Sequence, residues 1–123
     1  MEKDSEQLIN ELQAHMGFVL PFEATLAEED PEFLAEFSQM KNILFDRERA
    51  LPRKTKALIH IALSAARRAT GIKTHISRAM RLGATKQEIL EAMELSTFTF
   101  GAPAIKYGVE SLIAVLQEQK QAE

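Results

Sequence analysis

LPRKTKALIHIALSAARRATGIKTHISRAMRLGATKQEI, residues 51–89, is the most regular part of the chain and the most informative about its architecture. Its apolar residues recur at intervals of three and four, which places them on one face of an α-helix. Gly71 and Gly83 interrupt this spacing. Thr85 and Glu88 have the spacing of a capping box, in which two side chains bond the unpaired backbone N–H groups at a helix start. The stretch therefore predicts three consecutive helices.

The remainder of the chain has the same helical spacing, and no segment alternates long enough to predict a strand. The expected helices lie at about residues 5–16, 31–45, 52–69, 72–82, 86–100 and 104–116. Ser5 is expected to cap the first helix. Residues 18–29, which contain Pro21, are expected to form a connector with at most one helical turn, and the residues from Gln117 a polar tail. We therefore predict an all-α fold of about six helices.

The composition is that of an ordinary globular domain, with 123 residues, 46% hydrophobic, 27% charged and no cysteine. This length can bury a core without disulfides or a structural metal, so one domain over residues 1–123 is expected. The absence of cysteine excludes thiol exchange, thiolate nucleophiles and cysteine metal sites. The charged start and the lack of any window of ~18 uncharged residues predict a cytoplasmic protein without a membrane span.

The charges are unevenly distributed. Residues 49–87 contain ten Lys and Arg but no Asp or Glu, whereas the other 84 residues contain all 18 acids and five bases. This basic block favours a small anionic ligand or an acidic surface of another subunit. Nucleic acid is not expected as a partner, because the bases are spread over several helices and the acidic arms would repel phosphate.

Two histidines lie within the basic block. His75 is the better candidate for acid–base chemistry, because imidazole titrates near neutral pH and its helix carries several cations. A structural histidine bonded to a carbonyl is the alternative. His60 belongs to a polar stripe with Lys56, Ser64 and Arg67, which a solvated helix face explains equally well. No metal site is expected, because no two histidines stand at i and i+4 and the block has no carboxylate.

Several motifs with characteristic spacing resemble the carboxymuconolactone decarboxylase family. They are Leu51 to Ile59, His75 with Ala79, Gly83-Ala84-Thr85 and Gly101-Ala102-Pro103-Ala104. In the family, a histidine precedes the glycine of a Gly-x-Thr turn by eight residues, and a Gly-x-Pro turn follows some sixteen residues after the threonine. The core motif region spans residues 51–108. The resemblance implies an all-helical homo-oligomer, commonly a homotrimer or homohexamer.

One branch of the family resembles alkylhydroperoxidase D, which uses a CxxCxxxH motif and an upstream glutamate. The motif's histidine corresponds to His75. Its cysteines would fall at Arg68 and Gly71, or at Ala69 and Ile72 with a one-residue gap, and its glutamate at Ala57. Alkylhydroperoxidase or peroxiredoxin activity is therefore disfavoured, because neither alignment supplies a sulfur.

The other branch is γ-carboxymuconolactone decarboxylase, which acts on a dicarboxylated lactone without a cofactor. The resemblance implies cations that hold carboxylates and a residue that moves a proton as carbon dioxide leaves. His75 is the candidate acid–base residue, and the candidate substrate-binding cations are Lys56, Arg68, Lys73 and Arg78. Gly71 and Thr99 replace a glutamate and a tyrosine of the family pattern. A catalytically silent binding or assembly module is the alternative.

Overall fold

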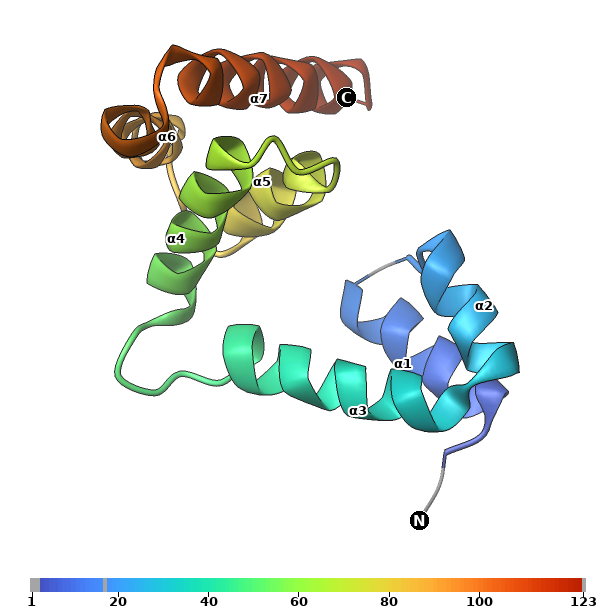
Figure 1. Ribbon diagram of the computed structural model, residues 1–123. Helices are drawn as coiled ribbons and strands as arrows, with labels where there is room; N and C mark the ends of the chain where they lie inside the picture. The colour runs from blue at the N-terminus through green and yellow to red at the C-terminus, as the bar shows by residue number, and fades with distance from the viewer. Residues whose placement is uncertain (1–2, 17, 123) are drawn as a thin grey trace. The chain divides into compact units, whose positions relative to one another are not determined.

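A computed structural model describes residues 3–16 and 18–122, except for the side chains of residues 15 and 16. Every regular element in these ranges is helical, which confirms the all-α prediction (Figure 1). The elements are α1 (Ser5–Met16), α2 (Pro21–Glu29), α3 (Pro31–Lys41), the π-helical η1 (Asn42–Asp46), α4 (Arg53–Ala66), α5 (Ile72–Arg81), α6 (Lys86–Phe100) and α7 (Ala102–Ala122). The chain divides into two compact units, Met1–Arg47 and Glu48–Glu123. The single domain expected over residues 1–123 stays a prediction.

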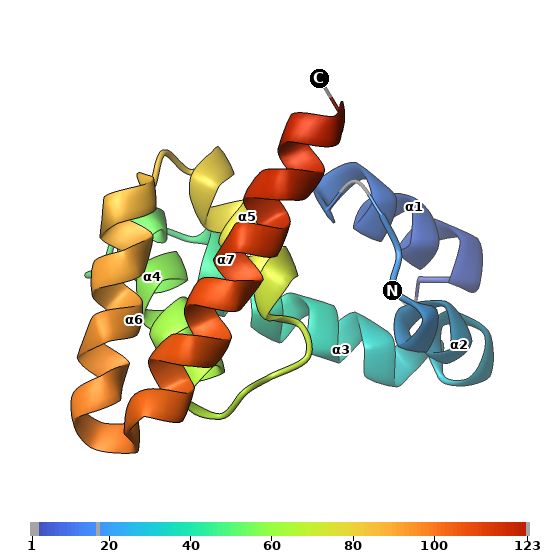
Figure 2. The ribbon, with the colours of Figure 1, turned by 90° about the horizontal axis from the view of Figure 1, so that it is seen from above.

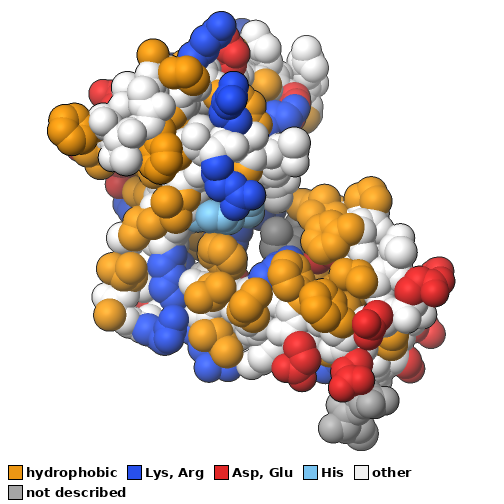
Figure 3. Space-filling model, in the orientation of Figure 1, with side chains coloured by type: hydrophobic (Ala, Val, Ile, Leu, Met, Phe, Trp, Pro, Cys, Tyr) orange, Lys and Arg blue, Asp and Glu red, His pale blue; other side chains and the backbone are white. Residues whose placement is uncertain are grey.

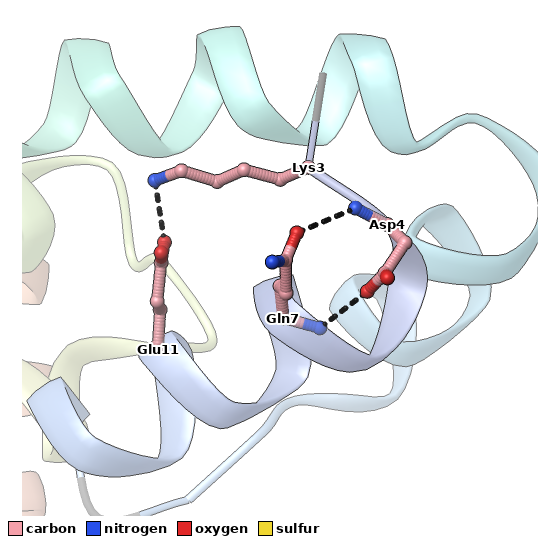
Figure 4. A network of polar contacts seen from close by, with 4 residues as sticks. All are labelled: Lys3, Asp4, Gln7 and Glu11. Atoms are coloured by element: carbon pink, nitrogen blue, oxygen red, sulfur yellow. Dashed lines mark hydrogen bonds and ion pairs between the residues drawn. The ribbon is translucent and has the colours of Figure 1, made fainter. Parts of the chain in front are cut away.

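The N-terminal unit packs α1, α2 and α3 around a small core. Its buried apolar side chains include Leu8, Leu12, Ala27 and Leu34. Figure 4 shows how α1 begins: the carboxylate of Asp4 accepts a hydrogen bond from the Gln7 backbone N–H at 2.8 Å, and the Gln7 side chain accepts one from the Asp4 N–H at 3.1 Å. The expected cap at Ser5 was therefore wrong by one residue, because the reciprocal pair three residues apart starts at Asp4.

The helix α2 occupies the segment that the sequence predicted as a connector. Pro21 stands in its first turn, where the missing N–H costs nothing. The Glu23 carboxylate, which is almost completely buried, accepts a hydrogen bond from the Leu20 backbone N–H at 3.1 Å and lies 3.2 Å from the Lys41 ammonium. A proline in the first turn and a glutamate that bonds the preceding backbone N–H thus account for α2, the helix that the sequence prediction lacked.

The C-terminal unit packs α4, α5, α6 and α7 around the larger core. Figure 2 shows α7 crossing the other helices of this unit. The largest fully buried side chains of this core are Ile61, Ile72, Ile76, Ile89, Met93 and Leu112. Gly108 lets α7 approach closely, since a Cβ there would lie 2.9 Å from the Met93 sulfur and 3.3 Å from the Ala65 Cβ. The helix α7 also continues to Ala122 through the expected polar tail, whose Gln, Glu, Lys and Ala residues favour helix.

The turns around α6 contain two glycines with left-handed backbone. Gly83 has φ 93° and Gly101 has φ 84°, values that other residues adopt only with strain. Thr85 forms the predicted capping box with Glu88, with hydrogen bonds of 2.9 and 3.1 Å. The Thr85 backbone N–H, followed by the Lys54 ammonium, holds the pKa of Glu88 below its usual value. Because Lys54 belongs to α4 and lies 3.0 Å from Glu88, this cap also joins α4 to α6.

Within the described ranges, none of the helices combines the length and the apolar character needed to cross a bilayer.

Candidate functional site

Two histidine rings meet between α4 and α5. The ring centroids of His60 and His75 lie 3.9 Å apart, and the ring planes are inclined at 60°. Both side chains are partly buried. Sequence reasoning singled out only His75, because the fourteen residues between the histidines include a chain reversal that spacing alone does not determine. The structure therefore adds His60 to the candidate site.

The connection between α4 and α5 is held by α7. The Tyr107 hydroxyl donates a hydrogen bond of 2.7 Å to the Ala69 backbone carbonyl. Arg68, directly before Ala69, has a left-handed φ of 51°. Beyond it, the Nε2 atom of His75 lies 3.8 Å from the position that a Cβ of Gly71 would occupy. The backbone before α5 thus passes close to the His75 ring and sets its surroundings.

His60 lies in a cationic environment. Burial lowers the pKa of His60 below 6.5, and the positive charges of Arg78 and Arg67 lower it further. All three causes disfavour the imidazolium, so His60 is neutral at neutral pH. The surroundings therefore favour the neutral form of His60.

The structure brings some of the predicted residues together and separates others. Arg78 lies one turn after His75 on α5 and is close enough to act on His60. Lys56 lies one turn before His60 on α4. Lys73, in contrast, points to α7, where its ammonium lies 2.9 Å from Glu118, and Arg68 is exposed in the connection after α4. Figure 3 shows histidine at the surface beside α4, with Lys and Arg side chains on two sides.

The structure confirms only part of the polar stripe that was expected on α4. Ser64 is 3% exposed and belongs to the buried face of the helix, so it does not share a solvated face with His60. Arg67 does lie near His60, as the spacing suggested. Among the described residues, no three His, Asp or Glu side chains gather in a group suited to a metal ion. The groups assembled here are two imidazoles and two guanidiniums, a set suited to binding an anion and transferring a proton.

The fold and this site define a class: an all-helical protein with an imidazole pair between two helices and arginines beside it. The chain belongs to the carboxymuconolactone decarboxylase family, whose sequence model matches residues 31–114, more than half of the chain.

Two solved structures have the same architecture. One is a protein from Burkholderia xenovorans LB400 that has been named, by inference, a carboxymuconolactone decarboxylase. It is 27% identical to this chain, with a TM-score of 0.75, and the match covers 96% of this chain and 95% of that one. The other is the apo form of a carboxymuconolactone decarboxylase family protein from Legionella pneumophila, 26% identical, with a TM-score of 0.70 and coverages of 92% and 95%. No curated protein matches the sequence.

Proposed function

We propose that the protein decarboxylates, or transfers a proton on, a small anionic lactone or carboxylate without a cofactor. The observation that carries this proposal is the contact between His60 and His75, at 3.9 Å between ring centroids, with Arg78 and Arg67 close to it. The guanidiniums would hold carboxylate groups of the substrate. The histidine pair would supply the group that transfers the proton.

The proposed reaction breaks the bond between a carbon and its carboxylate. Carbon dioxide leaves, and the electron pair of that bond moves into the conjugated lactone carbonyl. His75 then donates a proton to the carbon, and solvent water restores the proton to the imidazole. Arg78 would stabilise the negative charge that develops on the lactone, while His60, whose ring contacts that of His75, would orient the His75 ring.

The test is ultraviolet decarboxylation of γ-carboxymuconolactone by the purified protein. We expect His75→Gln to lower kcat by about 10²-fold or more, the range typical for a general acid or base. Arg81→Gln is the matched control, because Arg81 is an exposed cation at the end of the same helix. Thermal unfolding of each variant separates lost chemistry from lost fold. Activity that His75→Gln leaves intact would refute the role of His75, and a wild-type protein without turnover would reject this substrate.

A second candidate function is a binding or assembly module without catalysis. The observation that favours it is the strong exposure of apolar side chains on the C-terminal unit, which reaches 97% at Phe98. Thermal shift with small carboxylates distinguishes the two functions. Small carboxylates should stabilise an acid–base enzyme, and this stabilisation should be lost when Arg78 is replaced. They should not stabilise a protein that serves only in assembly.

A further inference from the structure

The side chain of Tyr107 on α7 is held at both of its ends. Its ring is partly buried and packs against the core of the C-terminal unit, and its hydroxyl donates the 2.7 Å hydrogen bond to the Ala69 carbonyl. The helix α7 packs against both α4 and α5, which carry the two histidines (Figure 2). An aromatic ring fixed in a core with its polar tip bonded is a rigid support for the backbone that it contacts.

The backbone of Ala69 joins three parts of the unit. Its carbonyl, which accepts the Tyr107 hydrogen bond, also accepts one of 3.2 Å from the N–H of Ile72, the first residue of α5. Its own N–H donates a hydrogen bond of 2.9 Å to the Ser64 carbonyl on α4. A shift of the Ala69 carbonyl would therefore move the first turn of α5 relative to α4.

His75 lies in that first turn. Its backbone N–H donates a hydrogen bond of 3.4 Å to the Gly71 carbonyl, and its Nε2 atom lies 3.8 Å from the position that a Cβ of Gly71 would occupy. The ring is thus placed against the same segment that Tyr107 supports. Because His60 belongs to α4 and His75 to α5, the 3.9 Å between their ring centroids depends on how this segment sets one helix against the other.

The same segment contains a backbone conformation that costs free energy. Arg68 has a left-handed φ of 51°, which a residue with a Cβ adopts only with strain. Such a conformation persists where the surrounding contacts hold it in place. Ala69 directly follows Arg68, so the Tyr107 hydroxyl acts at the point where the backbone needs this support.

We propose that Tyr107 is a positioning residue, whose hydroxyl keeps the His75 ring in contact with His60 by way of the Ala69 carbonyl. The inference rests on the proposed function of His75. Loss of the hydroxyl leaves the guanidinium groups near His60 in place, so it should impair proton transfer rather than the binding of carboxylates. A displacement of about 1 Å is enough to slow a step that depends on positioned groups by up to about 10²-fold.

The first test is an NMR measurement on the full chain that needs no substrate. We expect Tyr107→Phe to weaken or abolish the through-space signals between the ring protons of His60 and His75. Thr85→Ala is the matched control, because it removes a capping hydrogen bond of 3.1 Å at the start of α6 and so lowers stability outside the connection. Ring signals that Tyr107→Phe leaves unchanged would overturn the proposal, and so would an equal loss in both variants.

The second test is kinetic, with γ-carboxymuconolactone as the probe. Tyr107→Phe should lower kcat about tenfold and keep KM within about twofold, whereas Thr85→Ala should change neither. A higher KM with an unchanged kcat would overturn the positioning role. If the wild-type protein does not turn over this probe, the proposed reaction on it fails, and the ring signals of the first test still decide whether Tyr107 positions His75.

Discussion

Burial and two guanidinium groups act in the same direction on His60, because each disfavours its imidazolium form. The folded-state pKa of His60 therefore lies below the unfolded value of about 6.5. Well above pH 6.5 both states hold the neutral ring, so the contribution of this group to stability is fully present there. As the pH falls below 6.5, the unfolded chain binds a proton at His60 more readily than the folded protein does.

We expect the free energy of unfolding to decrease from pH 6.5 downward, and His60→Gln to make that decrease shallower. Denaturant titrations at closely spaced pH values measure both slopes. Resolved NMR titration of the ring gives the pKa itself, which Arg78→Gln should raise and Arg81→Gln should leave in place. A His60 that titrates at or above 6.5 in the wild-type protein would contradict this account.

At this scale, the sequence predicted part of the candidate site. The helical spacing of α5 correctly places Arg78 one turn from His75, because that relation is local. It could not show that His60 touches His75, since their contact depends on how the chain reverses between two helices. Nor could it show that Lys73 pairs with Glu118, forty-five residues away on α7.

Among the elements, the connection between α4 and α5 receives one side-chain hydrogen bond from α7, in addition to its own backbone hydrogen bonds. We expect Tyr107→Phe to lower the free energy of unfolding by about 1 kcal/mol, because the Ala69 carbonyl loses its hydroxyl donor. The change should also speed amide exchange in residues 69–72. Ser111→Ala is the control, since the Ser111 hydroxyl bonds the Tyr107 carbonyl within α7 itself. Equal exchange in the two variants would show that Tyr107 does not hold the connection.

The start of α6 was predicted from the sequence, whereas the start of α2 was not. Thr85 and Glu88 were recognisable because the capping pair follows directly after Gly83. The start of α2 carries comparable information in Pro21 and Glu23, but its apolar face is short and irregular. Helical periodicity therefore missed α2, whereas the proline and the glutamate three residues after Leu20 would have found it.

For the whole molecule, the two units differ in the size of their cores. The described core of the N-terminal unit is a cluster of four buried apolar residues, against eleven in the C-terminal unit. We expect hydrogen exchange to be faster in α1, α2 and α3 than in α4 to α7, because fewer apolar contacts oppose local opening. Exchange detected by mass spectrometry on the full chain measures this. Equal protection of both cores would show that the N-terminal unit gains stability from contacts beyond its own core.

The left-handed backbone at Arg68 identifies a position where the heat resistance of this protein could be raised by substitution. A residue with a Cβ in that conformation costs about 1 kcal/mol, which glycine would largely avoid. A screen that rewards melting temperature alone should therefore select Arg68→Gly. Because Arg68 is exposed and lies outside the groups assembled around His60 and His75, we expect the more stable variant to keep the affinity of the candidate site for anions.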